Sequence, residues 1–306
     1  MKKPNKRSVL KYFEPVDMGN VLSREMSDLD LDGSFGYFAY QKKDNILFLN
    51  RLKDEDIIRL LKKVGLTEHL NDMGFNDIQV EIDKDEALIN YLKIYYEKKK
   101  PDNLLIDLRV SESRFVPEKR FFDDNIDIVT LDMVVIEWLS AQKPEKHFDP
   151  DKPQLPGQNK PGLGSLKYMM DIMYLVGKEV VKDGFMDVPD HFHGAVMYSK
   201  KFKFFNPSHE AILKAMIRDL KEYSLADLSW GMITKTIIDK STGEPQVYDP
   251  SEQIFPVSRR MKDYFKSKKY QDKFKKVYKK KKYYFDYDAM LEKRKKMLSE
   301  KKTEEL

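Results

Sequence analysis

A glycine-containing loop that leads directly into an amphipathic segment places the strongest constraint on how this chain folds. The loop comprises residues 157–165, Gly-Gln-Asn-Lys-Pro-Gly-Leu-Gly-Ser. After it, apolar side chains recur at helical spacing within one arc: Met169, Met170, Met173, Val176 and Val180. Such a helix buries one face, so the rest of the chain must supply an apolar layer beneath it.

The segments around this helix predict a mixed sheet. The run from Met133 to Ile136 is apolar on both faces, which is typical of a central strand. Strands are predicted at 78–82, 104–110, 128–138, 185–189 and 204–207, and helices at 54–64, 87–96, 166–180 and 191–203. A hairpin between residues 230 and 248 is expected to close the C-terminal edge of the sheet. The predicted fold class is α/β (α+β), with a mixed, mostly antiparallel central sheet flanked by helices and a helical C-terminal tail.

The loop itself has the chemistry of an anion site. Glycine at 162 and 164 lets backbone N–H groups turn toward one point, and a following helix N-terminus adds unpaired donors and partial positive charge. A pyrophosphate would fit there. The alternative is that Pro161-Gly162 is only a turn before a helix.

The region from Ile128 to Asn206 resembles the GNAT superfamily of acyl-CoA-dependent N-acyltransferases. In that family a loop of pattern Gln/Arg-x-x-Gly-x-Gly/Ala binds the CoA pyrophosphate, and the register that fits places Asn159 at the Gln/Arg position. The resemblance implies pyrophosphate binding by Asn159 and by the four residues Gly162, Leu163, Gly164 and Ser165. It also implies that Leu139 and Ser140 align the pantetheine arm.

The same resemblance implies acetyl transfer from acetyl-CoA, as cosubstrate, to an amine. Tyr198, in Ala195-Val196-Met197-Tyr198, matches the tyrosine that protonates the departing CoA thiolate in many family members. More than 20 residues separate the end of the central strand from Gly162 here, whereas the family joins the two almost directly. This insertion is either a substrate lid or a sign that the cofactor geometry is lost.

One acidic residue and one polar cluster are candidates for further chemistry. Glu137 follows four apolar residues, and burial there would raise its pKa and suit a general base. The alternative is a solvated carboxylate at the strand end. The cluster from Asp187 to His193 suggests metal ligation, but His191 and His193 would diverge by roughly 200° on a helix. Asp190 is more simply explained as the helix N-cap, and no metal site is predicted.

Composition limits the remaining possibilities. The chain has no cysteine, which excludes disulfides, thiolate zinc sites and a cysteine nucleophile. It lacks a secretory signal and any run of about 18 apolar residues, so we expect a cytoplasmic protein without a membrane span. Residues 259–306 carry 19 Lys and Arg against 8 Asp and Glu, a local charge of +11.

These features predict three parts: an extension at 1–45, a GNAT-like domain at 46–256 and a basic, aromatic-rich helical tail at 257–306. The expected function is N-acyl transfer from acyl-CoA to an amine acceptor. One alternative is an inactive CoA-binding or partner-binding module of the same fold. A second alternative is nucleic-acid binding through the basic tail.

Overall fold

The computed structural model describes residues 46–85, 88–122, 130–144, 148, 154–179 and 182–300. The predicted N-terminal extension at 1–45 lies outside these residues. Residues from Asn45 onward belong to one compact unit. Among the described residues, no helix is long and apolar enough to cross a membrane.

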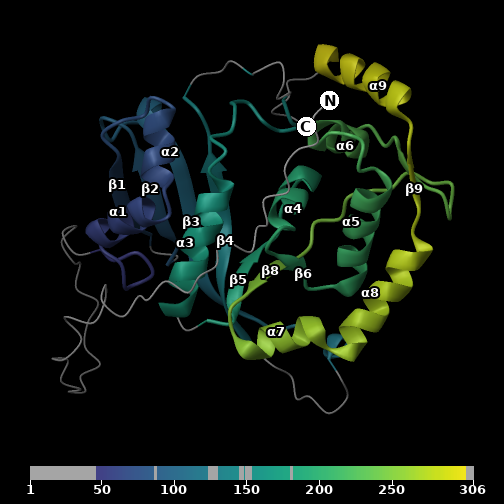
Figure 1. The fold of residues 1–306 in the computed structure, drawn as a ribbon, viewed down its shortest axis with the longest axis horizontal. Helices are drawn as coiled ribbons and strands as arrows, with labels where there is room; N and C mark the ends of the chain where they lie inside the picture. The colour runs from purple at the N-terminus through teal and green to yellow at the C-terminus, as the bar shows by residue number, and fades with distance from the viewer. Residues whose placement is uncertain are drawn as a thin grey trace, which may run out of the picture. The chain divides into compact units, whose positions relative to one another are not determined.

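The unit is built on a seven-stranded sheet with the order β1-β2-β3-β4-β5-β8-β6 (Figure 1). Of its neighbouring pairs, only β4 and β5 run parallel; the others are antiparallel. The strands are β1 (Gln79–Lys84), β2 (Asn90–Tyr95), β3 (Leu104–Phe115), β4 (Leu131–Ala141), β5 (Gly184–Asp187), β6 (Lys203–Phe204) and β8 (Gln253–Pro256). The predicted fold class is confirmed.

Helices flank this sheet, and a small second sheet joins β7 (Ile237–Asp239) to β9 (Tyr283–Phe285). Most helices belong to the segments after β4. The helices are α1 (Asp54–Lys63), α2 (Leu66–Asp72), α3 (Leu166–Glu179), α4 (Phe192–Tyr198), α5 (Pro207–Asp219), α6 (Leu225–Ile233), α7 (Arg259–Lys266), α8 (Lys268–Lys280) and α9 (Tyr287–Glu300), with 3-10 turns at Pro101–Asn103 and Lys119–Phe121.

Strand alternation divides the apolar side chains of β4 between two cores. Leu131 and Met133 face α7 and α8, together with Phe205, Tyr264 and Tyr270. On the other face lies α3, whose Gly177 packs closely on Phe185 of β5. Met133 and Val134, which point to opposite faces, are both fully buried, so the apolar run of β4 is buried on both faces, as predicted.

Two predictions of secondary structure are wrong. The described part of the predicted helix 87–96 is strand β2, because Leu92 and Ile94 alternate with half-buried polar residues and pair with β1 and β3. The predicted hairpin at 230–248 forms only in part: Leu225–Ile233 is helix α6, while β7 turns back on itself through the antiparallel bridge between Ile238 and Pro245. This short hairpin does not close the main sheet, because β7 also pairs with β9 in a separate sheet, and β6, paired with β8, forms the edge.

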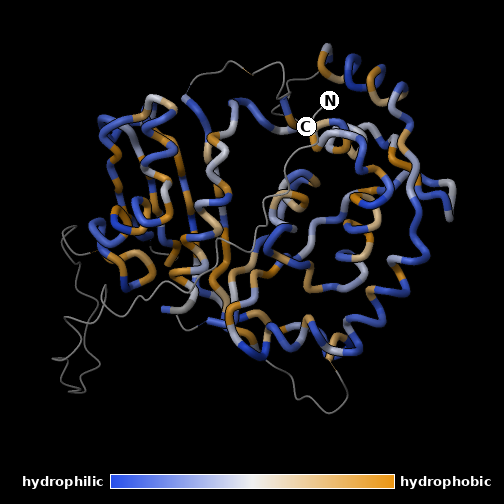
Figure 2. Tube along the Cα trace, viewed as in Figure 1, coloured by the Kyte–Doolittle hydropathy of each residue, from blue (hydrophilic) through white to orange (hydrophobic). Residues whose placement is uncertain are grey.

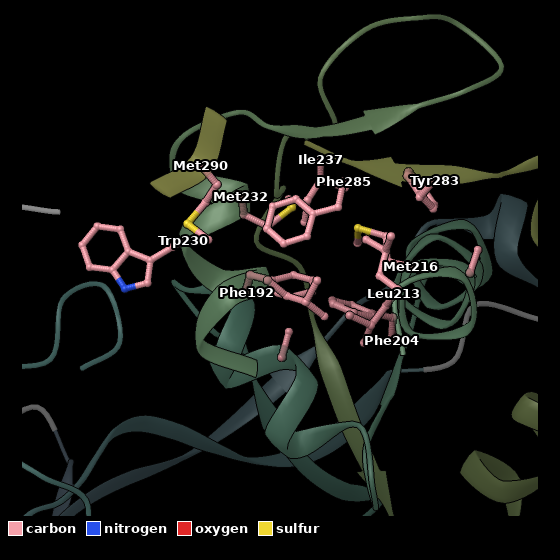
Figure 3. Packing of buried hydrophobic residues seen from close by; sticks show 14 residues of the cluster. Phe192, Phe204, Leu213, Met216, Trp230, Met232, Ile237, Tyr283, Phe285 and Met290 are labelled. Carbon is pink, nitrogen blue, oxygen red and sulfur yellow. The ribbon is translucent and has the colours of Figure 1, made fainter. Parts of the chain in front are cut away.

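A third core lies beyond the sheet, among α4, α5, α6, β9 and α9. Figure 3 shows Phe192, Met216, Phe285 and Met290 converging on one apolar interior. Trp230 belongs to this cluster and is fully buried, with its indole N–H donating to the carbonyl of Gln154 at 2.9 Å. The helices after β5 thus form their own packed layer.

The basic tail is packed rather than appended. Tyr264 and Tyr270 donate hydroxyl hydrogen bonds of 2.8 Å to the carbonyls of Phe205 and Phe204, respectively. The guanidinium of Arg260 donates to the buried carboxylate of Asp183, just before β5. Residues 259–285 therefore complete the core that they cover.

We predict that Arg260→Ala destabilises the protein by roughly 2–4 kcal/mol, because it leaves the carboxylate of Asp183 buried without its cationic partner. Urea unfolding at pH 7 measures this effect. The matched control is Arg259→Ala, which removes the neighbouring guanidinium from an exposed pair with Asp263. Equal effects of the two substitutions would contradict the assigned role of Arg260.

Candidate functional site

The parallel pairing of β4 with β5 is short, and it leaves an opening in the sheet. Only three residue pairs form, from Met133–Gly184 to Val135–Met186. Strand β4 then continues to Ala141, whereas β5 ends at Asp187. Beyond Val135, within the described residues, the β5-side edge of β4 has no strand partner. An extended ligand can hydrogen-bond to such an edge.

A bulge lies where the two strands part. Val110 of β3 pairs with Ile136, but Arg109 pairs with Trp138, so Glu137 is an extra residue in β4. The Glu137 side chain is exposed and accepts a 2.5 Å hydrogen bond from the Ser111 hydroxyl. Of the two alternatives for Glu137, the structure therefore supports the solvated carboxylate, and the argument for Glu137 as a buried base loses its premise.

The two residues predicted to align a pantetheine arm are not equivalent. The N–H of Gln142 donates to Leu105 of β3, while the carbonyl of Ala141 accepts from Leu163 on the opposite side. Because backbone groups alternate along a strand, the N–H and carbonyl of Leu139 point to the same side as those of Ala141. Leu139 therefore faces the opening, whereas the backbone of Ser140 is turned to β3.

The long insertion after β4 is closed at its base. Lys143 donates its N–H to Pro161 at 2.8 Å, and Leu163 donates to Ala141 at 3.1 Å. Gly162 lies opposite Gln142 in an isolated bridge. The glycine loop therefore starts beside the end of β4 in space, although about 20 residues intervene in the sequence. The long separation of strand and loop in the sequence is therefore not a separation in space.

The loop is held firmly and presents free donors. A ring nitrogen of His69, on α2, lies 2.8 Å from the carbonyl of Leu163, which is buried. Within the described residues, the N–H groups of Gly164, Ser165, Leu166 and Lys167 donate no hydrogen bond. They surround the N-terminus of the 14-residue helix α3. An anion can be bound there by backbone donors alone.

An unsatisfied hydroxyl marks the same place. The side chain of Ser165 is only 1% exposed, and its Oγ has no hydrogen-bond partner. Gly162 and Gly164 are exposed, and an added Cβ at either would meet no atom closer than 3.8 Å. Gly164 has φ +66°, a conformation that favours glycine. Asn159 is exposed, upstream of this donor cluster.

A buried acid lies at the end of β5. Asp187 is 9% exposed. Burial, with a smaller contribution from the negative charge of Asp190, raises the pKa of Asp187 to about 7, although the Val188 N–H partly opposes this. A carboxyl group with this pKa changes protonation state near neutral pH, as a general base must.

Tyr198 lies close enough to Asp187 to feel its charge. Burial and that charge raise the pKa of Tyr198, so its hydroxyl stays protonated at neutral pH. Its ring packs against Phe202, with centroids 5.1 Å apart. The hydroxyl makes no hydrogen bond to any described residue. Tyr248 is also near Asp187, but its hydroxyl donates to the carbonyl of Pro189 at 2.6 Å.

The two histidines stack instead of diverging. His191 is the N-cap of α4, so it precedes the helix, and its ring lies 5.2 Å from that of His193 at an interplanar angle of 12°. The expectation that Asp190 caps this helix is wrong. Burial, with a contribution from His191, lowers the pKa of His193 to about 4, so this ring is neutral at pH 7. Among the described residues, no group of three or more acidic or histidine side chains could hold a metal ion.

The end of the insertion covers these rings. Gly157, at φ +74°, lies so close to His191 that an added Cβ would be 2.8 Å from its Nε2. Gln154, near the same turn, is held by Trp230. The described end of the insertion is thus in contact with both His191 and Trp230.

Sequence reasoning did not single out Asp187 as a candidate acid–base group. It identified the cluster from Asp187 to His193 but assigned it to metal ligation or helix capping. The sequence signal for Asp187 was its position at the end of the short apolar segment that begins at Phe185, a few residues before helix α4. Comparison with known proteins finds no family model, curated protein or solved structure that matches this chain.

Proposed function

We propose that this protein is an acyl-CoA-dependent N-acyltransferase that transfers an acetyl group to an amine. The observation that carries the proposal is the opening between β4 and β5, with the donor-rich start of α3 at one border and a buried acid at the other. The GNAT resemblance implies the same arrangement. The sheet and its flanking helices are compatible with that family.

The residues at the opening suit the parts of the cosubstrate. The free N–H groups at 164–167 and the unpaired hydroxyl of Ser165 would hold the pyrophosphate. The backbone of Leu139 would hydrogen-bond the pantetheine arm, which carries amide groups of its own. Acyl-CoA supplies an activated thioester. Every remaining task falls to side chains near Asp187.

One of the two proton transfers in the reaction can be assigned to a side chain. An amine arrives as an ammonium ion, and two protons must leave its nitrogen during the reaction. Asp187 accepts the first proton and releases it to solvent, because its pKa of about 7 lets it cycle at neutral pH. The second proton ends on the sulfur of the departing CoA.

Tyr198 is suited to stabilise that sulfur. Its pKa is raised above the usual value of about 10, whereas a thiol has a pKa of about 8.5. Full proton transfer from Tyr198 to the thiolate is therefore uphill. A hydrogen bond donated by the neutral hydroxyl is the favourable interaction, and the hydroxyl has no other partner among the described residues.

Binding of acetyl-CoA tests the proposal first. Isothermal titration should detect binding to the wild type, and Gly162→Asp should weaken it at least tenfold by placing a negative charge beside the phosphates. Gly162 has room for a side chain, so the variant should fold. Gly162→Asn is the matched neutral control and should lose much less affinity. Absence of wild-type binding would reject the proposal.

Turnover separates an enzyme from a CoA-binding module. Wild type should release CoA in the presence of at least one amine from a panel of spermidine, a lysine peptide and an aminoglycoside. Its kcat/KM should rise with pH through about 7, because Asp187 acts as a base only when ionised. Asp187→Asn should remove this rise and lower turnover about 10²–10⁴-fold.

In the same assay, Tyr198→Phe should keep the rise near pH 7 and lower kcat about 10- to 100-fold, with little change in KM for acetyl-CoA. This pattern marks an interaction made only in the transition state. Wild-type kcat in a folded Tyr198→Phe protein would show that Tyr198 is only a packing residue. Binding of acetyl-CoA without transfer to any amine would favour the inactive module.

A further inference from the structure

Helix α8 displays a dense set of unneutralised cations. We define its lysine face as the six exposed residues Lys268, Lys273, Lys275, Lys276, Lys279 and Lys280. The only acidic residue of this helix is Asp272. None of the six lysines has an ion-pair partner among the described residues. Figure 2 shows hydrophilic residues predominating along α8.

The packing of α8 fixes which way this face points. Tyr270 is buried and bonded to Phe204, and Phe274 and Tyr278 are half-buried on the same side of the helix. At about 100° per residue, the six lysines fall on the opposite side, over an arc of roughly 160°. The run Lys279–Lys282 does not lie wholly on the helix, because α8 ends at Lys280. In the structure, Lys281 leaves the helix and pairs with Asp239.

The spacing of these charges suits a regular polyanion. A helix of 13 residues is about 20 Å long, so six positive charges lie along that length. Nucleic acids carry phosphates at comparable density, and each phosphate contact by lysine releases counterions. We propose that the lysine face binds the sugar–phosphate backbone of nucleic acid.

The structure favours this partner over a membrane. An amphipathic helix that binds lipid inserts an apolar face, but the apolar side of α8 is packed on the body of the protein. No exposed apolar residue interrupts the lysine face. Contacts to phosphate without base contacts are independent of sequence.

A groove lies between α5 and α8, on the side of α8 that faces the body of the protein. It measures about 640 Å³ and runs along α5 and α8. Its lining includes Lys203, Arg218, Phe274 and Tyr278, with the Arg218 guanidinium 4.4 Å from the Tyr278 ring centroid. Because Phe274 and Tyr278 lie on the side of α8 opposite to the lysine face, this groove is separate from the proposed phosphate contact. Single strands and duplexes share the sugar–phosphate backbone, so the experiment uses both as probes to show which one the protein binds.

Fluorescence anisotropy tests the proposal with the full chain. The probes are a labelled random-sequence DNA of about 30 nucleotides and its duplex, titrated across a range of KCl concentrations. Wild type should bind at least one probe, with affinity falling steeply as salt rises. The test variant replaces Lys275, Lys276 and Lys279 with Gln. It should lose at least tenfold in affinity and reduce the salt slope by about 2 to 3.

The matched control replaces Lys98, Lys99 and Lys100 with Gln. These three lysines are exposed between β2 and β3, and the control has the same net charge as the test variant. It should retain wild-type affinity. Equal losses in both variants, binding without salt dependence, or binding only to phosphatidylserine vesicles would overturn the proposal. Because the assay contains no acyl-CoA, its result is independent of the proposed transfer reaction.

Discussion

The carboxylate of Asp183 ties together the segments on which the rest of the structure depends. This carboxylate accepts hydrogen bonds from the backbone N–H of Asp132, at 2.8 Å, and from the guanidinium of Arg260. The backbone carbonyl of Asp183 accepts hydrogen bonds from the N–H groups of Val257 and Ser258. Burial would raise the pKa of Asp183, but these hydrogen bonds outweigh it and hold the pKa below its usual value. The starts of β4 and β5 and the end of β8 are thereby joined at one point.

This junction determines where the sheet can open. Beside it, Gly184 approaches β8 so closely that a Cβ would lie 2.5 Å from the carbonyl of Phe255, so β5 is tightly paired at its start. Three residue pairs later, β4 and β5 separate. The opening therefore lies between two strands that are held together at their starts. The unpaired backbone groups at the end of β4 are thus carried by a strand whose position is fixed. Asp187 ends the fixed part of β5, so its side chain is both buried and placed at that border.

The sequence predicted the fold better than the site, for physical reasons. The apolar run of β4 and the amphipathic pattern of α3 are local signals, and both elements formed where expected, within a few residues. Strand β2 was missed because Leu88, Tyr91, Leu92 and Tyr95 have helical spacing, while Leu92 and Ile94 have strand spacing in the same short segment. The burial of Asp187 and the exposure of Glu137 depend on a bulge and on packing between distant segments, which no local pattern encodes. The closed base of the insertion likewise depends on pairing between Gln142 and Gly162.

The central claim is that the β4–β5 opening binds acyl-CoA, and hydrogen–deuterium exchange with and without acetyl-CoA tests it most directly. Backbone amides at 136–143 and at 162–170 should exchange more slowly in the presence of acetyl-CoA, because the strand edge and the start of α3 would donate to it. Amides of α8, remote from the opening, serve as the internal control and should be unchanged. Protection confined to other segments, or no protection at saturating acetyl-CoA, would contradict the account.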